Sequence, residues 1–356
     1  MAHDLGLKDS LIAMTVSLYV FGMAFGQLIG GTMSDGLGRS PVIIFGLLVF
    51  ATCSVFLAHA NSEFSLLFWR IIQSLGGGIA VVGVPAIIRD NADGKEAARL
   101  FALIGLIMLI APTIAPSIGT VILMLFTWHW IFYFVAVFAI VIAILTWLIM
   151  PASESQRRFK NPIGGFYLVL SEQRALGFLF AQAFGFSTLL TFITNSPLVY
   201  IGHFGVPVQT FSMLFVVNVI GIMLINRFNV LLLRKLDSVV LLQLFLAMQL
   251  IGCIGILLVT IFLPTNLIFS LVCIAVAMAA NGGIVVNSTP CFLKFFGEHA
   301  GVASGILGAS TYIIGGFISG VSTMLYTGSI LYVFIIMTTC TSIALYSAYK
   351  AAKLQK

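Results

Sequence analysis

The chain has 356 residues, of which 60% are hydrophobic and 8% are Asp, Glu, Lys or Arg; its mean hydropathy is +1.15 and its formal net charge is +6. A soluble domain carries about 25% charged residues, so this chain has too few polar side chains to cover a soluble globule. Its apolar runs reach the roughly 20 residues that an α-helix needs to cross a bilayer. They lack the alternation over about 10 residues that is typical of membrane β-strands. The composition therefore predicts an all-α polytopic membrane protein.

Eleven apolar runs are expected to form transmembrane helices. In chain order they cover residues 10–33, 41–59, 64–88, 99–125, 130–150, 175–201, 208–226, 238–262, 266–291, 301–325 and 328–349. The joints between them are short, and the longest follows the fifth run. We therefore predict an N-terminal helical bundle over residues 1–150, a cytoplasmic central loop over 151–174 and a C-terminal helical bundle over 175–356.

Basic residues are distributed unequally between the two sides of this arrangement. Alternate joints and the C-terminal tail hold fifteen of the seventeen Lys and Arg residues, whereas the opposite side holds only Lys8, and Arg70 lies within a run. Cytoplasmic loops of membrane proteins are enriched in Lys and Arg. The C-terminus is therefore expected in the cytoplasm, and the odd number of spans places the N-terminus outside. The positive net charge reflects this orientation and does not indicate nucleic-acid binding.

The sequence lacks the patterns that are typical of catalytic or metal sites. The five cysteines include no CxxC pair and lie almost entirely within apolar runs, where they are expected to pack as small apolar residues. The five histidines fall at the ends of the runs, and no nucleotide-binding loop or nucleophile–base pair is found. We therefore expect no catalytic residue, no metal and no cofactor, and predict that the chain is not an enzyme.

The short stretch GGTMSDGLGRSP, residues 30–41, places an acid and a base among glycines between the first two runs. Gly31, Asp35, Gly38 and Arg39 fit the pattern G-x-x-x-D-x-x-G-R. This pattern resembles the signature loop between helices 2 and 3 of transporters of the major facilitator superfamily. Two positions depart from it, because Gly36 and Ser40 stand where that family often has basic residues.

Other stretches resemble the same family in the same order. Arg70 and Gln73 in WRIIQSLGGG match the spacing of its helix-4 arginine motif. Pro116 and Gly119 in IAPTIAPSIGT resemble the antiporter motif of helix 5, with Ala before the proline and only one of the paired glycines. Asp90, preceded by Arg, follows helix 4 as in drug exporters. The combination is most similar to the bicyclomycin-resistance (Bcr/CflA) branch of drug:proton antiporters.

The resemblance implies a fold of two pseudo-symmetric helical bundles and a proton-coupled multidrug efflux transporter of the inner membrane that works by alternating access. Its partners would be protons, a small hydrophobic drug-like substrate and the lipid bilayer, with no nucleic acid, and it would act as a monomer. The position of the glycine-rich turn implies that the eleven runs are family helices 2–12 and that the first helix is apparently lacking. Two alternatives stay open: an N-terminally truncated, transport-impaired remnant, and a facilitator of a specific metabolite.

Charged residues give the first candidates for the transport machinery. Asp35 is expected to cap the cytoplasmic end of the helix that begins near Gly301, because a helix N-terminus favours an anion, and Arg39 is expected to pair with Asp90. These residues would form a gating loop, although a turn that only sets topology would also explain them. Arg70, the only ionisable residue placed well within a run, is the candidate for proton coupling; snorkelling to the outer interface is the alternative.

Uncharged residues give the remaining candidates. Pro112 and Pro116 lie four apart and are expected to bend their helix, which would either seal the contact between the halves or be a static kink. Glycines at 22, 26 and 30 are expected to pack the first run against the tenth. Candidates for lining a substrate cavity are Tyr19, Gln73, Gln182, Asn195, Asn218, Asn281 and Asn287, with Phe192 and Tyr200 as further aromatic walls. Hydrogen bonds between helices would explain the amide residues equally well.

Overall fold

The computed structural model describes residues 9–150, 162–297, 299–325 and 329–354. Within these ranges, the described side chains exclude those of residues 9–14, 16, 17, 94, 95, 106, 108–114, 116, 117, 120, 162, 163, 208, 209 and 212. The described residues form helices and connecting turns, with no strand among them.

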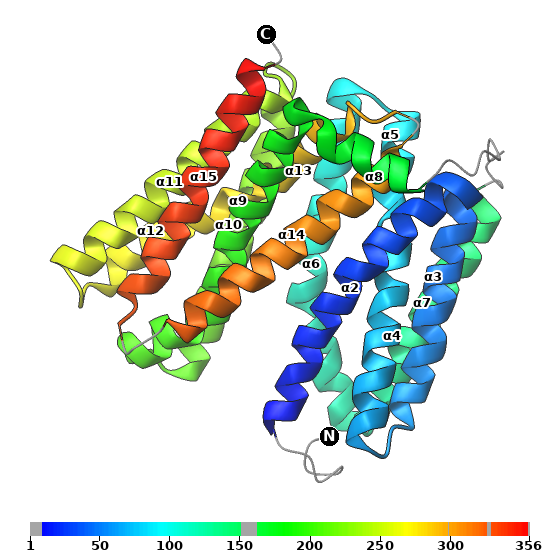
Figure 1. Cartoon of the computed structure of the whole chain (residues 1–356). Helices are drawn as coiled ribbons and strands as arrows, with labels where there is room; N and C mark the ends of the chain where they lie inside the picture. The colour runs from blue at the N-terminus through cyan, green and yellow to red at the C-terminus, as the bar shows by residue number, and fades with distance from the viewer. Residues whose placement is uncertain (1–8, 151–161, 298, 326–328, 355–356) are drawn as a thin grey trace. The chain divides into compact units, whose positions relative to one another are not determined.

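The helices follow one another with short connections (Figure 1). In chain order they are α2 (Asp9–Leu37), α3 (Arg39–Ala58), α4 (Glu63–Val81), α5 (Gly83–Asn91), α6 (Gly94–Leu125), α7 (His129–Ile149), α8 (Pro162–Ser171), α9 (Gln173–Pro197), the π-helix η1 (Leu198–His203), α10 (Val208–Leu232), α11 (Ser238–Phe262), α12 (Leu267–Ala279), α13 (Asn281–Leu293), α14 (Ala300–Met324) and α15 (Leu331–Lys353).

Each of the eleven predicted spans coincides with one helix or with two consecutive helices. Three spans are composite: α4 continues into α5, α9 into η1, and α12 into α13. Within the described residues, nine segments are long and apolar enough to cross a membrane. The other two predicted spans correspond to helices α2 and α6, which have 29 and 32 residues. Some side chains of these two helices are not among those described. The central joint was predicted as a loop throughout; it instead contains α8, whose sequence PIGGFYLVLS is apolar enough to pack as a short helix.

The chain divides into two compact units. One comprises Met1–Asn91, Ile114–Ser171 and Phe296–Tyr312, and the other comprises Ala92–Thr113, Glu172–Phe295 and Ile313–Lys356. Helices α6 and α14 therefore contribute residues to both units. The predicted bundles were divided at the central joint alone, and their boundaries stay a prediction.

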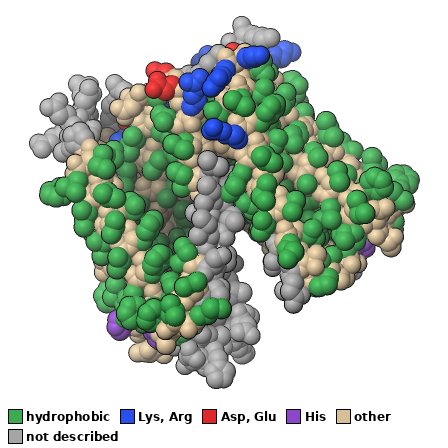
Figure 2. All heavy atoms as spheres, turned by 180° about the vertical axis from the view of Figure 1, so that it is seen from behind, with side chains coloured by type: hydrophobic (Ala, Val, Ile, Leu, Met, Phe, Trp, Pro, Cys, Tyr) green, Lys and Arg blue, Asp and Glu red, His purple; other side chains and the backbone are tan. Residues whose placement is uncertain are grey.

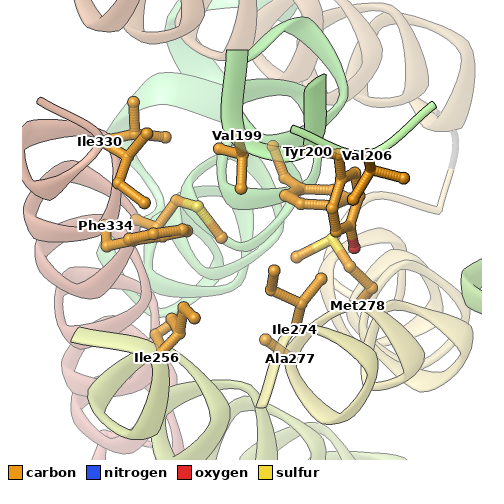
Figure 3. Packing of buried hydrophobic residues seen from close by; sticks show 13 residues of the cluster. Val199, Tyr200, Val206, Ile256, Ile274, Ala277, Met278, Ile330 and Phe334 are labelled. Atoms are coloured by element: carbon orange, nitrogen blue, oxygen red, sulfur yellow. The ribbon is translucent and has the colours of Figure 1, made fainter. Parts of the chain in front are cut away.

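The second unit has a hydrophobic core contributed by several helices. Figure 3 shows Tyr200, Val206 and Met278 lying together, with Ile330 and Phe334 from the end of the chain on another side of the cluster. The side chains of Tyr200 and Phe334 are fully buried. In lipid there is no hydrophobic driving force between helices. Close van der Waals packing of side chains such as these remains favourable there.

The outer sides of the helices are apolar, as expected of surfaces that face lipid. Figure 2 shows hydrophobic side chains covering most of one face of the molecule, whereas the Lys, Arg, Asp and Glu side chains visible in this view gather toward its top. Exposed apolar residues such as Trp147 (70% exposed), Phe317 (72%) and Phe262 (73%) would be unfavourable in water but suit a bilayer. The structure and the composition thus agree on a multi-pass membrane protein.

Candidate functional site

The N-terminus of α14 is capped by the side chain of Asp35 at the end of α2. The backbone N–H groups of Gly301 and Val302 donate to Oδ1 and Oδ2 of Asp35, each at 2.8 Å. The first N–H groups of a helix have no partner within the helix, and the helix dipole favours an anion at this position. One carboxylate thus satisfies two free donors on a helix that lies 266 residues later in the chain. All three residues belong to the first unit.

Arg39, the first residue of α3, connects this cap to the end of α5. Its Nη1 donates to Oδ1 of Asp35 at 2.6 Å and to Oγ of Ser34 at 2.9 Å, and its Nε donates to Oδ2 of Asp90 at 2.9 Å. The Asp35 and Arg39 side chains are only 9% and 12% exposed, whereas Asp90 is 38% exposed. The contacts that the sequence suggested for Asp35 and for Arg39 are therefore both present, and Ser34 is an additional partner that the sequence did not indicate.

Glycine residues allow the end of α2 to lie close to the beginning of α14. A Cβ atom at Gly301 would lie 2.5 Å from Oδ1 of Asp35 and 2.6 Å from the carbonyl oxygen of Gly31. A Cβ atom at Gly31 would lie 2.6 Å from the carbonyl oxygen of Gly301. Gly38, with φ of 93°, occupies the left-handed region and turns the chain from α2 into α3. We call Gly31, Asp35, Gly38, Arg39, Asp90 and Gly301 the capped turn.

The glycine stripe of α2 does not face the helix that the sequence suggested. Side chains at Gly22 and Gly26 would overlap Ser74 and the carbonyl oxygen of Leu75 in α4, and one at Gly30 would lie 2.7 Å from Cα of Ile79. The prediction that this stripe packs against α14 was therefore wrong. Gly31, the next position along α2, contacts α14 instead, because it lies about 100° further around the helix.

A second residue of α2, which the sequence analysis missed, lies against α14. Gln27 is 3% exposed, and its Oε1 occupies the position that a side chain at Gly308 would need. Its Nε2 is buried without a hydrogen-bond partner among the described residues, as is Oγ of Ser304. The available signal was spacing, since Gln27 lies four residues before Gly31 and therefore on nearly the same face of α2.

Arg70 lies within α4 among uncharged polar and aromatic groups. Its Nη1 donates to Oε1 of Gln73 at 2.7 Å, and its Cζ lies 4.6 Å from the centre of the Tyr19 ring. Gln73, 1% exposed, in turn donates from Nε2 to Oγ of Ser54 in α3 at 2.7 Å. The structure thus brings together three predicted site residues, Tyr19, Arg70 and Gln73. All three residues belong to the first unit, and the choice between proton coupling and snorkelling for Arg70 stays a prediction.

Most of the other predicted cavity residues are buried and bonded to neighbouring helices. Gln182 accepts from Oγ of Ser288 and Oγ1 of Thr289 at 2.7 and 2.9 Å. Asn195 donates to Oγ of Ser322 at 2.7 Å. Asn287 donates to Oδ1 of Asn229 at 2.7 Å. Asn218 and Asn281 are each 7% exposed, and Oδ1 of Asn281 is buried without a partner among the described residues. These contacts fit the alternative role, hydrogen bonding between helices.

Two further groups of candidates have different outcomes. Phe192 and Tyr200, expected as aromatic walls, are 1% and 0% exposed and belong to the hydrophobic core of Figure 3. The side chains of Pro112 and Pro116 lie outside the described residues, although α6 runs from Gly94 to Leu125 through both positions. Gly119 has open space around it. The effect of the prolines on α6 stays a prediction.

The capped turn between α2 and α3 and the residues around Arg70 define the class of protein. It is a membrane transporter with a signature turn between two helices. Residues 1–320 match the Major Facilitator Superfamily. The chain belongs to this superfamily, as the resemblance of the turn suggested.

Two of the relatives are named for drug resistance. The chain is 29% identical over 319 residues to a bicyclomycin resistance protein homolog of Haemophilus influenzae, covering 88% of this chain and 80% of the relative. It is 30% identical over 208 residues to the multidrug resistance protein MdtL of a Shewanella species, covering 57% of this chain and 52% of the relative. The match to MdtL thus spans about half the length of each protein.

Solved structures share the fold at low sequence identity. The proton:xylose symporter XylE matches with a TM-score of 0.79 at 14% identity, covering 98% of this chain and 88% of XylE. The transporter FucP, solved in an outward conformation, also has a TM-score of 0.79 at 14% identity, covering 97% of this chain and 91% of FucP. The major facilitator fold predicted from the turn motif is therefore confirmed.

Proposed function

We propose that this protein exports hydrophobic drug-like compounds across the bacterial inner membrane by alternating access, driven by protons, with its C-terminus in the cytoplasm. The likeness to a bicyclomycin resistance protein homolog and to MdtL supports the substrate class. The resemblance of Arg70, Pro116 and Gly119 to antiporter motifs supports proton coupling. The excess of Lys and Arg in alternate joints supports the orientation.

The single observation that carries the proposal is the cap of Asp35 on α14. In alternating access, the cytoplasmic ends of helices separate when the transporter opens inward. A closed end therefore needs contacts that are specific but breakable. A capping side chain contributes about 0.5–2 kcal/mol, and an exposed ion pair such as that of Arg39 with Asp90 about 0–1 kcal/mol. Contacts of this size can hold a closed state and still be broken in every cycle.

Breaking the cap would expose the backbone N–H groups of α14 but would leave the Asp35 carboxylate paired. When α14 moves away from α2, the N–H groups of Gly301 and Val302 lose the Asp35 carboxylate and become available to cytoplasmic water. The Asp35 carboxylate keeps Arg39 as a partner, so it is not left as an isolated charge. The turn can therefore release α14 while α2, α3 and α5 stay connected through Arg39.

A facilitator of a specific polar metabolite is the second candidate. The buried amides of the second unit favour it, because Asn281 keeps a carbonyl oxygen free and such groups recognise polar substrates by hydrogen bonding. The two candidates differ in their energy source and in their substrate range.

The test is efflux from proteoliposomes that contain only the purified chain, loaded with a hydrophobic fluorescent dye. We expect an imposed pH gradient to accelerate dye release severalfold and a protonophore to abolish the acceleration. Release that is independent of the gradient would contradict proton coupling. Failure to move several unrelated hydrophobic dyes, together with uptake of one polar compound, would favour the facilitator.

A further inference from the structure

We propose that the end of α15 binds an anionic phospholipid. Lys350 and Lys353 hold the phosphate of its headgroup, and Tyr346 and Tyr349 pack against the glycerol and the adjoining part of its acyl chains. We call these four residues the lipid face of α15, the helix drawn in red in Figure 1. The inference goes beyond the proposed export function, because it concerns the bilayer around the protein and not the transported compound.

The four residues of the lipid face lie on one side of the helix. Their positions follow the spacing i, i+3, i+4 and i+7 of a single helix face, and all four are exposed. Tyr346 and Tyr349 are 69% and 56% exposed. The buried side of the same turns consists of alanines, which pack against α9: a Cβ atom at Gly177 would lie 2.6 Å from Cβ of Ala351. The lipid face therefore points away from α9.

The length of α15 brings this face to the headgroup layer of the bilayer. The helix has 23 residues, slightly more than the roughly 20 that cross a hydrocarbon core. Tyrosine is enriched where the hydrocarbon core meets the headgroups. Lys350 and Lys353 lie about 6 and 10 Å beyond Tyr346 along the helix axis, at 1.5 Å per residue. The tyrosine rings thus lie at the boundary of the core, and the ammonium groups lie in the headgroup layer.

The two lysines supply a positive charge to this layer. α15 contains no Asp or Glu, and neither Lys350 nor Lys353 forms an ion pair with a described residue. Residues three apart are neighbours on a helix surface, with Cβ atoms about 5–6 Å apart. Both ammonium groups can therefore reach one phosphate, and a lysine near the membrane surface is attracted by anionic lipid.

An apolar surface continues from the lipid face toward the middle of α15, and it favours a lipid over a soluble anion. Ile343 and Ile335 are 38% and 41% exposed. They lie three and eleven residues before Tyr346, on nearly the same side of the helix. A free phosphate or an acidic protein would contact the lysines alone, whereas the acyl chains of a phospholipid also cover the tyrosines and isoleucines.

The experiment compares two lipids with the same acyl chains, dioleoyl phosphatidylglycerol and dioleoyl phosphatidylcholine. Binding of the first lipid molecule to the purified full chain in detergent is measured by native mass spectrometry. We expect phosphatidylglycerol to bind at least tenfold more tightly than phosphatidylcholine. Lys350→Gln and Lys353→Gln should each weaken phosphatidylglycerol binding about fivefold, and the double variant should bind the two lipids equally. Phosphatidylcholine binding should not change.

Two controls separate this site from general surface charge. Replacing both lysines by arginine should retain the preference for phosphatidylglycerol, because the charge is kept. Arg227→Gln removes an exposed arginine of α10 and should change neither affinity. A loss of phosphatidylglycerol binding in Arg227→Gln as large as in the double lysine variant would contradict the assignment to α15.

Equal affinities for the two lipids in the unmodified protein would overturn the proposal, as would full phosphatidylglycerol binding by the double lysine variant. Displacement of the lipid by excess glycerol 3-phosphate at constant ionic strength would show a site for a soluble anion and would also overturn it. If the double variant does not elute as a folded species, the two single variants decide in its place. Because lipid binding is measured without a gradient or a transported compound, it can fail while dye efflux succeeds, and the reverse.

Discussion

A single carboxylate, Asp35, holds together parts of the chain that the sequence separates widely. It caps α14 through two backbone N–H groups and accepts from Arg39. Its charge matters as well as its shape, because both the helix dipole and the guanidinium favour an anion. The acid and base in the turn therefore have a structural reason to be retained in a chain that is otherwise almost without charge.

Asp35→Asn should slow dye efflux severalfold while leaving the amount of protein in the membrane unchanged. The amide keeps one acceptor oxygen but loses the charge and the second acceptor, at a cost within the roughly 0.5–2 kcal/mol of a capping residue. Efflux in cells is measured beside quantified membrane expression. Asp237→Asn is the control, because Asp237 lies directly before α11 but its side chain makes no cap. Normal efflux by Asp35→Asn at normal expression would contradict the role of the cap.

Asp90→Asn should have a smaller effect than Asp35→Asn. Its ion pair with Arg39 is more exposed, at 38% for Asp90, and exposed pairs contribute about 0–1 kcal/mol. Arg39 also keeps Asp35 and Ser34 as partners. The measurement is the efflux rate of both variants at several salt concentrations, since screening weakens exposed pairs. A larger loss in Asp90→Asn would show that the connection to α5 matters more than the cap.

At the scale of elements, α2 has two packing faces that are specified by glycine. Gly22, Gly26 and Gly30 face α4, whereas Gly31 faces the beginning of α14. The sequence predicted close packing from the four-residue repeat, but the repeat itself does not say which neighbour it meets. A stripe of small residues can pack against any helix that also presents small residues. The partner therefore depends on the tertiary arrangement.

Gly31→Ala should weaken the contact of α2 with α14, whereas Gly36→Ala should not. Both residues lie in α2, and alanine favours a helix over glycine by about 0.8–1 kcal/mol. At Gly31, however, the added Cβ meets the carbonyl oxygen of Gly301 at 2.6 Å, while nothing lies within 4 Å at Gly36. Thermal unfolding in detergent should show a lower Tm for Gly31→Ala and an equal or higher Tm for Gly36→Ala. A Tm for Gly31→Ala as high as that of Gly36→Ala would refute the close approach.

For the whole molecule, hydropathy was enough to predict the spans because a bilayer demands long apolar helices. The turn motif predicted the superfamily, and its acid and base predicted the partners at Gly301 and Asp90. The bonding of the amide residues could not be predicted, because Gln182 and Asn195 meet partners more than 100 residues away. The same holds for Phe192 and Tyr200, whose burial depends on helices α11, α12 and α15.

The central claim is that the cap of Asp35 keeps the cytoplasmic end of the α2–α14 contact closed. Ser304, 5% exposed on α14, reports on it: Ser304→Cys, with the native cysteines replaced, is reacted with a membrane-impermeant thiol reagent added to everted vesicles. We predict slow labelling in this background and labelling at least fivefold faster when Asp35→Asn is added, with no change for Asp237→Asn. Equal labelling rates with and without Asp35→Asn would contradict the account.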